Sequence, residues 1–546
     1  MSSIEVALAM LLAVVGSGYL VRILPFSLPL PLVQIALGAV IAGVFKHGVA
    51  LDPDIFFLLF LPPLLFIDGW RIPKDGLRRD RGTILSLALG LVVFTVIGAG
   101  FLIHWLIPAM PLAVAFALAA IVSPTDPVAV SSLAARVPIP KRLMHILEGE
   151  SLLNDATGLV CFRFAVAAVV TGGFSLTSAT LTFLWVALIG LGVGVAFTAA
   201  VSFAQSWLSR HFGQEAGSPI LISLLIPFGA YLLAERLQAS GILAAVAAGI
   251  TMSRVELSGR LLATTRVQRA AVWSTVQFAL NGIMFVLLGE QLPTSLHSAL
   301  ASVAQSGHRS AWWLLVYALA INLALALLRL VWVWVTLRVN MFKASRRGAP
   351  VTSVHWRLLL ATSLSGVRGA ITLAGVLTLP LLLPDGTSFP ARELVIFLAT
   401  AVIVLSLLAA SVGLPPLLRG LKLPPEPAAR IEENLARRVA ATAAIATIKH
   451  AQHEAMGTAA TVDIDTWTRA ATRVIALYQH WLDEDASSAG EAQQLRKGDM
   501  AERELRLAAL QGQREAIFDL ARREQISDEV SRRLVREIDL QEARYR

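Results

Sequence analysis

Two acidic positions lie within long apolar runs of the sequence, and the first is Asp126. It stands between Pro124 and Pro127 in the run PLAVAFALAAIVSPTDPVAVSSLAA. Two prolines three residues apart remove two backbone donors and clash with the preceding turn, so a helix should break there. The Asp126 carboxylate and the Thr125 carbonyl or hydroxyl would then offer oxygen ligands to a small cation. The alternative is a proline kink with an acid at a loop boundary.

The second acidic position is Asp155, in the run HILEGESLLNDATGLVCF. Ser151 and Asp155 are four residues apart, as are Glu150 and Asn154, so each pair shares one face of a helix. Asp155 therefore points along the Ser151 direction, while Glu150 and Asn154 can hydrogen-bond on a neighbouring stripe. The alternative is that Asp155 caps a helix start, and the uncharged run ATGLVCF that follows it argues against this.

Two arginines within apolar runs could complement these acids. Arg329 lies in ALALLRLVWVWV and Arg368 lies in SGVRGAITLAG. A guanidinium group stays charged, so each needs an anionic or carbonyl partner inside the protein. We predict that Arg329 pairs with Glu150, the alternative being a side chain that reaches back to the membrane surface. Arg368 could tie the carbonyls of a broken helix or contribute directly to the ion site.

The elements that must position these residues are membrane-spanning helices. The chain has 546 residues, of which 56% are hydrophobic and 15% charged, a balance that favours a membrane protein. Apolar stretches of about 20 residues recur over the first 420 positions, and each can cross a bilayer as a helix. We expect thirteen spans, at residues 4–23, 27–45, 54–70, 82–106, 111–135, 146–171, 180–207, 218–235, 239–253, 271–292, 311–337, 356–382 and 393–418.

The twelfth expected span is interrupted like the fifth, since it contains Gly366, Gly369 and Gly375 and then Pro380. Thirteen spans fit two six-helix units, spans 1–6 and 8–13, joined by span 7. This division pairs the fifth span with the twelfth, and the odd offset of seven makes the two units inverted. Matched interruptions in two inverted halves point to the binding site of a transporter. We therefore predict an all-α polytopic protein with two interrupted, crossing helices.

The basic residues of the loops alternate along the chain. If the N-terminus is outside, the cytoplasmic loops are strongly basic, as the positive-inside rule predicts. These loops hold Arg71, Lys74, Arg78, Arg79, Arg81, Arg136, Lys141, Arg142, Arg254, Arg260, Arg266, Arg269, Arg338, Lys343, Arg346, Arg347 and Arg357, and the opposite loops hold only Lys46, Arg236, Arg309 and Arg392. We expect a bacterial inner-membrane protein whose C-terminus is cytoplasmic.

The composition divides the chain into a transmembrane domain, 1–422, and a cytoplasmic helical tail, 423–546. The first part holds 28 Lys and Arg against 16 Asp and Glu, and the second holds 18 against 21. The basic excess therefore belongs to membrane topology and not to nucleic-acid binding. The tail is rich in Ala, Glu, Arg and Leu at helical spacing, as in MAERELRLAALQGQREAIFDLARREQ. It is either a solvated helical tail or a regulatory or dimer-contacting element.

The sequence carries no motif of the common enzyme classes. It has no G-x-S-x-G, no H-E-x-x-H and no phosphate-binding loop. Its single cysteine, Cys161, cannot form an intramolecular disulfide and has no metal-ligand spacing around it. We expect neither an enzyme nor a bound cofactor.

Four segments together resemble the monovalent cation/proton antiporter family. They are FFLLFLPPLLFIDGW, SPTDPVA, ESLLNDATG and GVRGA, in that order. The resemblance covers roughly residues 5–420 and is closest to the NhaP-type sodium/proton antiporters and the animal sodium/proton exchangers. It implies an ion-translocating core, a dimerisation domain and hence a homodimer.

Matched residue by residue, the resemblance implies that Asp155 is the main carrier of cation and proton. Asp126 and Thr125 belong to the crossing of the two interrupted helices, and Ser151 is a further ligand. The implied Na+ ligands are therefore Asp155, Asp126, Thr125 and Ser151.

The resemblance also implies a supporting pair, Glu150 and Asn154, with Arg329 near Glu150. Relatives with Asn-Asp at this place are electroneutral and those with Asp-Asp are electrogenic. The Asn154-Asp155 pair therefore implies exchange of one cation for one proton, in the service of pH, sodium and volume homeostasis.

The expected mechanism is exchange without ATP. Protons and sodium compete for the same carboxylate oxygens, and only a neutralised carrier crosses the apolar barrier cheaply, so alternating exposure enforces exchange. The alternatives are a K+/H+ (or Li+) antiporter of the same fold, a proton-coupled organic solute transporter, and a channel. The solute transporter is disfavoured because the polar groups in mid-membrane are few and acidic.

Overall fold

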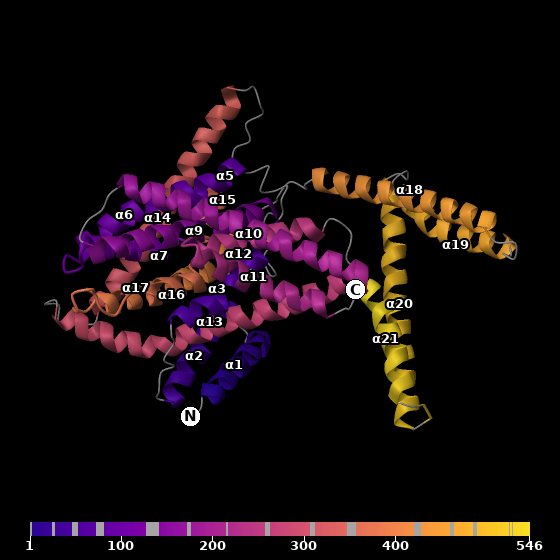
Figure 1. The fold of residues 1–546 in the computed structure, drawn as a ribbon, viewed down its shortest axis with the longest axis horizontal. Coiled ribbons are helices and arrows are strands. Elements are labelled where there is room, and N and C mark those ends of the chain that lie inside the picture. Colours follow the sequence, from indigo (N-terminus) through magenta and orange to yellow (C-terminus); the bar gives the residue numbers. More distant parts are fainter. Residues whose placement is uncertain are drawn as a thin grey trace. The chain divides into compact units, whose positions relative to one another are not determined.

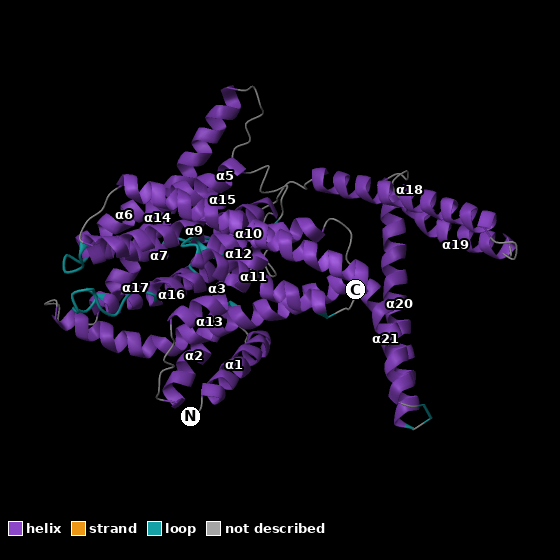
Figure 2. Ribbon diagram, in the orientation of Figure 1, coloured by secondary structure: helices purple, strands orange, loops and turns teal. Residues whose placement is uncertain are grey.

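The structure is a computed structural model. It describes residues 3–23, 28–45, 53–72, 81–126, 141–171, 176–213, 217–256, 263–305, 312–346, 356–419, 427–458, 464–483, 489–523, 525–526 and 528–545. The described residues form helices and no named strand (Figures 1 and 2). The chain divides into two compact units, Met1–Leu421 and Lys422–Arg546.

The first half of unit 1 contains α1 (Ser3–Ile23), α2 (Leu30–Phe45), α3 (Pro53–Arg71), α5 (Arg81–Leu85), the π-helix η1 (Ser86–Leu91), α6 (Val92–Leu106), α7 (Leu112–Val122) and α9 (Lys141–Thr171). The second half contains α10 (Leu176–Phe212), α11 (Ser218–Arg236), α12 (Gly241–Glu256), α13 (Ala263–Gln305), α14 (Trp312–Arg346), α15 (Trp356–Leu364), α16 (Ala370–Leu377) and α17 (Arg392–Leu418). Eight of the described helices are long and apolar enough to cross a membrane, and α2 and α7 are shorter apolar helices. The total of thirteen crossings stays a prediction.

Helix α7 ends at Val122, so the fifth expected span, 111–135, is broken where the prolines begin. Its second part, from Pro127 to 140, lies outside the described residues. The twelfth expected span is also two helices, α15 and α16, separated by residues 365–369. Both interruptions therefore lie where the sequence predicted a break.

Several helices run past the expected ends of the spans. Helix α13 covers Ala263–Gln305 where the sequence predicted 271–292, and α14 covers Trp312–Arg346 where it predicted 311–337. The hydropathy criterion stops at the first charges, but Arg, Lys and Gln are good helix formers and continue the helix. The apolar length of a span is thus a lower limit on the length of its helix.

The two expected inverted units are reflected in how the helices pair. Helix α2 packs on α13 and α3 packs on α12. At each pairing two glycines face the partner's backbone, Gly38 and Gly289 in the first and Gly69 and Gly249 in the second. In the predicted repeat, each span corresponds to the span seven places later. Helix α2 then corresponds to α12 and α3 to α13, so the α2–α13 pairing corresponds to the α12–α3 pairing.

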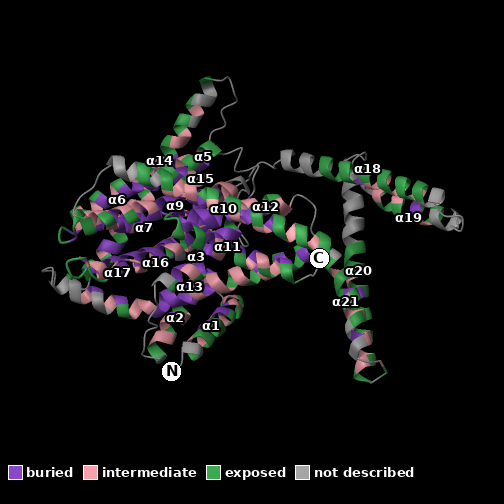
Figure 3. Cartoon of the chain, viewed as in Figure 1, coloured by how far each residue is buried: buried purple, intermediate pink, exposed green. Residues whose placement is uncertain are grey.

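Burial follows the membrane pattern. Buried residues gather in the interior of the bundle, around α3, α9 and α16 (Figure 3). Large apolar side chains are exposed on outer helix faces, such as Trp185 and Leu188 of α10 and Leu323 of α14. A bilayer would cover these faces, since its hydrocarbon core contains no water and suits apolar side chains.

Unit 2 consists of α18 (Pro427–Thr458), α19 (Ile464–Asp483), α20 (Ala489–Arg522) and α21 (Asp528–Tyr545). Helix α18 packs on α19, and α20 packs on α21. Arg514 joins the second pair through ion pairs to Asp539, at 2.8 Å, and to Glu542. Hydrogen bonds to Glu542 and Asp539, together with their negative charges, raise the pKa of Arg514. The tail is helical, as its composition predicted.

Candidate ion-binding site

The two interrupted helices touch through their broken backbones. The Asp126 backbone N–H donates to the Val367 carbonyl at 2.7 Å. At Gly369 an added Cβ would overlap the Asp126 carboxyl group, so the side chain of Asp126 lies directly against the start of α16. A helix N-terminus favours negative charge. Gly369 is thus required for the approach, which a larger residue would prevent.

Arg368 fastens this crossing and is 4% exposed. Its Nε donates to the Val122 carbonyl at 2.9 Å, at the last residue of α7, and its Nη1 donates to the Gly366 carbonyl. Its backbone N–H donates to Ser406 Oγ at 3.1 Å. Of the two roles considered for Arg368, the contacts are those of the residue that ties broken-helix carbonyls.

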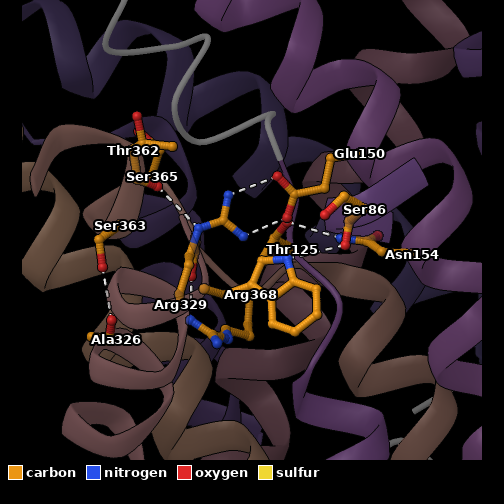
Figure 4. Close-up of polar contacts among 12 residues, drawn as sticks. Ser86, Thr125, Glu150, Asn154, Ala326, Arg329, Thr362, Ser363, Ser365 and Arg368 are labelled. Atoms are coloured by element: carbon orange, nitrogen blue, oxygen red, sulfur yellow. Dashed lines mark hydrogen bonds and ion pairs between the residues drawn. The ribbon is translucent and has the colours of Figure 1, made fainter. Parts of the chain in front are cut away.

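Arg329 of α14 lies against Glu150 of α9. One guanidinium nitrogen contacts Glu150 Oε1, and Nη2 donates to Oε2 at 2.7 Å, while Nε donates to the Thr362 carbonyl at 3.0 Å (Figure 4). The two side chains are 2% and 1% exposed. The structure thus places Arg329, and not Arg368, on Glu150, in the bidentate geometry that suits guanidinium and carboxylate.

Thr125 stands between Glu150 and Asn154. Its hydroxyl donates to Glu150 Oε1 at 3.2 Å, and Asn154 Nδ2 donates to Thr125 Oγ1 at 3.0 Å (Figure 4). The Thr125 hydroxyl therefore links the two side chains that the sequence expected to bond directly. Since both its donor and an acceptor position are occupied, its carbonyl is the better candidate for a cation.

Asp155 and Ser151 lie on a different stripe of α9 from Glu150 and Asn154. Both are buried, with exposed fractions of 5% and 7%. Asp126 is close enough for its charge to act on Asp155. The structure therefore places Asp155 within reach of the charge of Asp126, while the printed hydrogen bonds of Glu150 and Asn154 go to Thr125 and Arg329.

The sequence profile described as "Sodium/hydrogen exchanger, transmembrane" matches residues 8–420. The chain belongs to this family. It is therefore a multi-pass membrane transporter and not an enzyme. The exchanger is 40% identical over 541 residues to an uncharacterized Na+/H+ exchanger, YjcE, of Escherichia coli (strain K12), with 98% of this chain and 97% of that one covered.

Two further relatives define how far the likeness reaches. The exchanger is 43% identical over 419 residues to the sodium, potassium, lithium and rubidium/H+ antiporter of Bacillus pumilus (strain SAFR-032), covering 76% of this chain and 61% of that one. Its fold is similar to that of the sodium proton antiporter MjNhaP1 from Methanocaldococcus jannaschii, with a TM-score of 0.57 at 17% identity. That match covers 77% of this chain and 99% of MjNhaP1.

The exchanger has one further acid at the site that the sequence reasoning missed, Asp68 of α3. Its charge acts on Asp155, and the charges of Asp126, Arg71 and Glu148 act on it. Asp68 is an exposed residue near the end of α3. The sequence signal for Asp68 is an acid inside the apolar run FLPPLLFIDGW, a run that contributes only to the family resemblance.

Within the described residues no three or more His, Cys, Asp and Glu side chains are grouped as metal ligands would be. Near Asp155, Ser151 stands one turn earlier on α9 and Asp126 is close enough for its charge to act, so both offer side-chain oxygen donors. Hard oxygen ligands of this kind suit a small cation such as sodium.

Proposed function

We propose that this exchanger carries Na+ in one direction and H+ in the other at Asp155, with Asp126, Ser151 and the Thr125 carbonyl as further cation ligands. The observation that carries the proposal is how the buried charges are distributed. Asp155 is buried close to Asp126, whereas the two arginines predicted to complement the acids bind elsewhere, Arg329 on Glu150 and Arg368 on carbonyls. A buried carboxylate needs a proton or a cation, since leaving it charged and uncompensated is costly.

Competition between the two ions gives the exchange. A proton and a sodium ion both neutralise the same carboxylate, so bound Na+ must leave before H+ binds. The neutralised site can be presented to the other side of the membrane. Moving the site in its charged form would instead carry the full free-energy cost of an ion in an apolar barrier. Movement of one helix bundle against the other then exposes the site alternately.

The stoichiometry is one Na+ for one H+. Asn154 precedes Asp155 on α9, and its amide is engaged with the Thr125 hydroxyl. An amide adds no titratable charge next to Asp155. Each cycle then moves one positive charge in each direction, and the exchange is electroneutral.

Potassium is the second candidate cargo. The support for it is the 43% identity to a Bacillus pumilus antiporter whose name includes sodium, potassium, lithium and rubidium. We therefore extend the proposal to Li+ and K+, in competition with Na+ for the same site.

The topology and assembly form part of the proposal. The end of α3 that bears Arg71, and the start of α9, lie on the cytoplasmic side, because the basic loops belong there. Residues 1–422 are then the exchanger domain of a bacterial inner-membrane protein, and 423–546 are a cytoplasmic tail. The homodimer is supported only by the resemblance to the NhaP-type antiporters.

The test uses purified protein in liposomes with an imposed pH gradient and a lumenal pH dye. Sodium, lithium or potassium is added in turn, with and without a potassium-valinomycin clamp. We expect cation-dependent pH recovery that the clamp leaves unaltered and that Asp155→Asn abolishes. Full recovery in Asp155→Asn would exclude this carboxylate as the carrier, and recovery that follows the clamp would exclude electroneutral exchange.

A further inference from the structure

A cavity lies on the side of Asp155 away from Asp68. It has a volume of about 640 Å³ and is lined by residues of α3, α9, α11, α12 and the end of α16. Its walls are mostly apolar and include Phe57, Leu159, Phe162 and Val166. A space of this size holds many water molecules, since one needs only about 15 Å³ of such volume.

The cavity lies on the same stripe of α9 as the carrier carboxylate. Leu159 lies one turn after Asp155, about 6 Å along the axis, and Arg163 lies about 12 Å along it. Leu159 is 4% exposed and also faces Gly375 of α16, next to Ile121 of α7. Along α9, the buried Leu159 side chain therefore lies between Asp155 and the rest of the cavity.

Helix α3 shows that the cavity and Asp68 lie at opposite ends of the path. Phe57 and Leu58 line the cavity, and they precede Asp68 by about ten residues, or about 15 Å of helix. Asp68 acts on Asp155 and is exposed to solvent, whereas Phe57 is 8% exposed. The site therefore has an exposed acid on its Asp68 side and buried apolar side chains on its cavity side.

One ion pair at the rim of the cavity joins two groups of helices. Arg163 of α9 lies 3.5 Å from Glu235 of α11, and their side chains are 54% and 35% exposed. Helix α9 packs mainly with α7 and η1 and has smaller contacts with α3 and α12, whereas α11 packs mainly with α12, α10 and α3. A movement of α9 and α7 against the other group would therefore have to separate this pair.

From these observations we propose that the cavity is the outer vestibule of the ion path and that Arg163 and Glu235 form the latch that keeps it closed. The inference rests on the proposed function. When the latch opens, the Glu235 carboxylate is released at the rim and can attract the arriving or departing cation. The apolar walls can part without leaving buried polar groups unpaired, which would be costly.

The test measures accessibility and not transport. In a Cys161→Ser background, Val166→Cys reports on the cavity and Arg71→Cys reports on the Asp68 side. A membrane-impermeant, positively charged methanethiosulfonate is added to either side of oriented vesicles. We expect the two cysteines to be labelled from opposite sides. Adding Glu235→Gln should increase the labelling rate of Val166→Cys about two- to fivefold, as for a partly exposed pair.

The variants are chosen to separate the latch from other roles of the same residues. Glu235 also accepts a hydrogen bond from the Gly241 backbone N–H at 3.4 Å, and glutamine retains that acceptor. Arg163→Met keeps the apolar stem and should match the effect of Glu235→Gln. Val170→Cys, also on the cavity wall, replaces Val166→Cys if that variant does not fold.

Two outcomes would overturn the inference. Labelling of the cavity cysteine from the same side as Arg71→Cys would show that the cavity is not an outer vestibule. Unchanged labelling in Glu235→Gln and Arg163→Met would show that the pair is not a latch. Loss of sodium-dependent pH recovery alone would count against the proposed function and leave the labelling result intact.

Discussion

Two buried carboxylates, those of Glu150 and Asp155, lie little more than one helical turn apart on α9, and their surroundings are opposite in charge. Glu150 is held by the Arg329 guanidinium and the Thr125 hydroxyl. Asp155 instead faces the negative charges of Asp126 and Asp68. A charge that is fully matched by fixed partners suits a framework, whereas one surrounded by like charges suits an exchangeable ion. The position of the counter-charge, more than burial, distinguishes the two roles.

The comparison is tested most strongly by neutralising Asp155. We expect Asp155→Asn to reduce sodium-dependent pH recovery in liposomes to the background of empty vesicles, because no proton can be exchanged at an amide. The same variant should keep the unfolding temperature of the wild type, since it removes repulsion from Asp126. A lowered unfolding temperature with residual exchange would place Asp155 in the framework.

The opposite response is expected at Arg329. Arg329→Met leaves the Glu150 carboxylate buried without its cation, which costs about 3–5 kcal/mol of folding free energy. The measurement is the loss of the monodisperse peak in size-exclusion chromatography after heating. As a matched control, Glu150→Gln combined with Arg329→Met should regain much of the stability, because no uncompensated charge remains. Equal stability of the single and double variants would contradict the framework role.

A smaller effect is expected where the two helices cross. Gly369→Ala adds a Cβ that overlaps the Asp126 carboxyl group. Shifting it aside should cost about 1–3 kcal/mol and weaken the apparent affinity for sodium. Gly192→Ala on α10 is the matched control, because a Cβ there has nothing within 4 Å. If both variants exchange sodium like the wild type, Asp126 does not need its observed position.

Much of the site was predictable because its elements are specified locally. Two prolines three residues apart, Pro124 and Pro127, favour a helix break, and a buried guanidinium such as that of Arg329 requires an anionic or carbonyl partner. The role of Asp68 was not predictable in this way. It lies near the end of its span, where an acid is ordinarily solvated, and only the packing of α3 against the core brings it near Asp155.

Other features depend on contacts between distant segments. The π-helix η1 lies inside an apolar run with no local signal, and Trp332 of α14 explains its position. The indole packs against Gly90 and donates to the Ser86 carbonyl at 3.2 Å. A π-turn leaves some backbone carbonyls without their regular α-helical hydrogen bonds. The cavity beyond Leu159 likewise arises from helices more than 200 residues apart in sequence.

The smallest expected effect comes from a carboxylate whose donors are at the surface. In the loop between α16 and α17, Asp385 accepts hydrogen bonds from the Thr387 backbone N–H at 3.0 Å and hydroxyl at 2.6 Å. These donors lower the pKa of Asp385. Its contribution to stability is therefore present above the unfolded-state pKa of about 3.9 and is lost as the pH falls through the lower folded-state pKa.

Asp385→Asn should accordingly lower the unfolding temperature at pH 7 by no more than about 2 °C, and this difference should shrink as the pH falls towards the folded-state pKa. Sodium-dependent pH recovery should be unchanged, because Asp385 and Thr387 are both exposed at the surface. Thr387→Val, which removes one donor, should give a similar small change. If Asp385→Asn reduced exchange as strongly as Asp155→Asn, the contrast between carboxylates with fixed donors and carboxylates that exchange their ions would not hold.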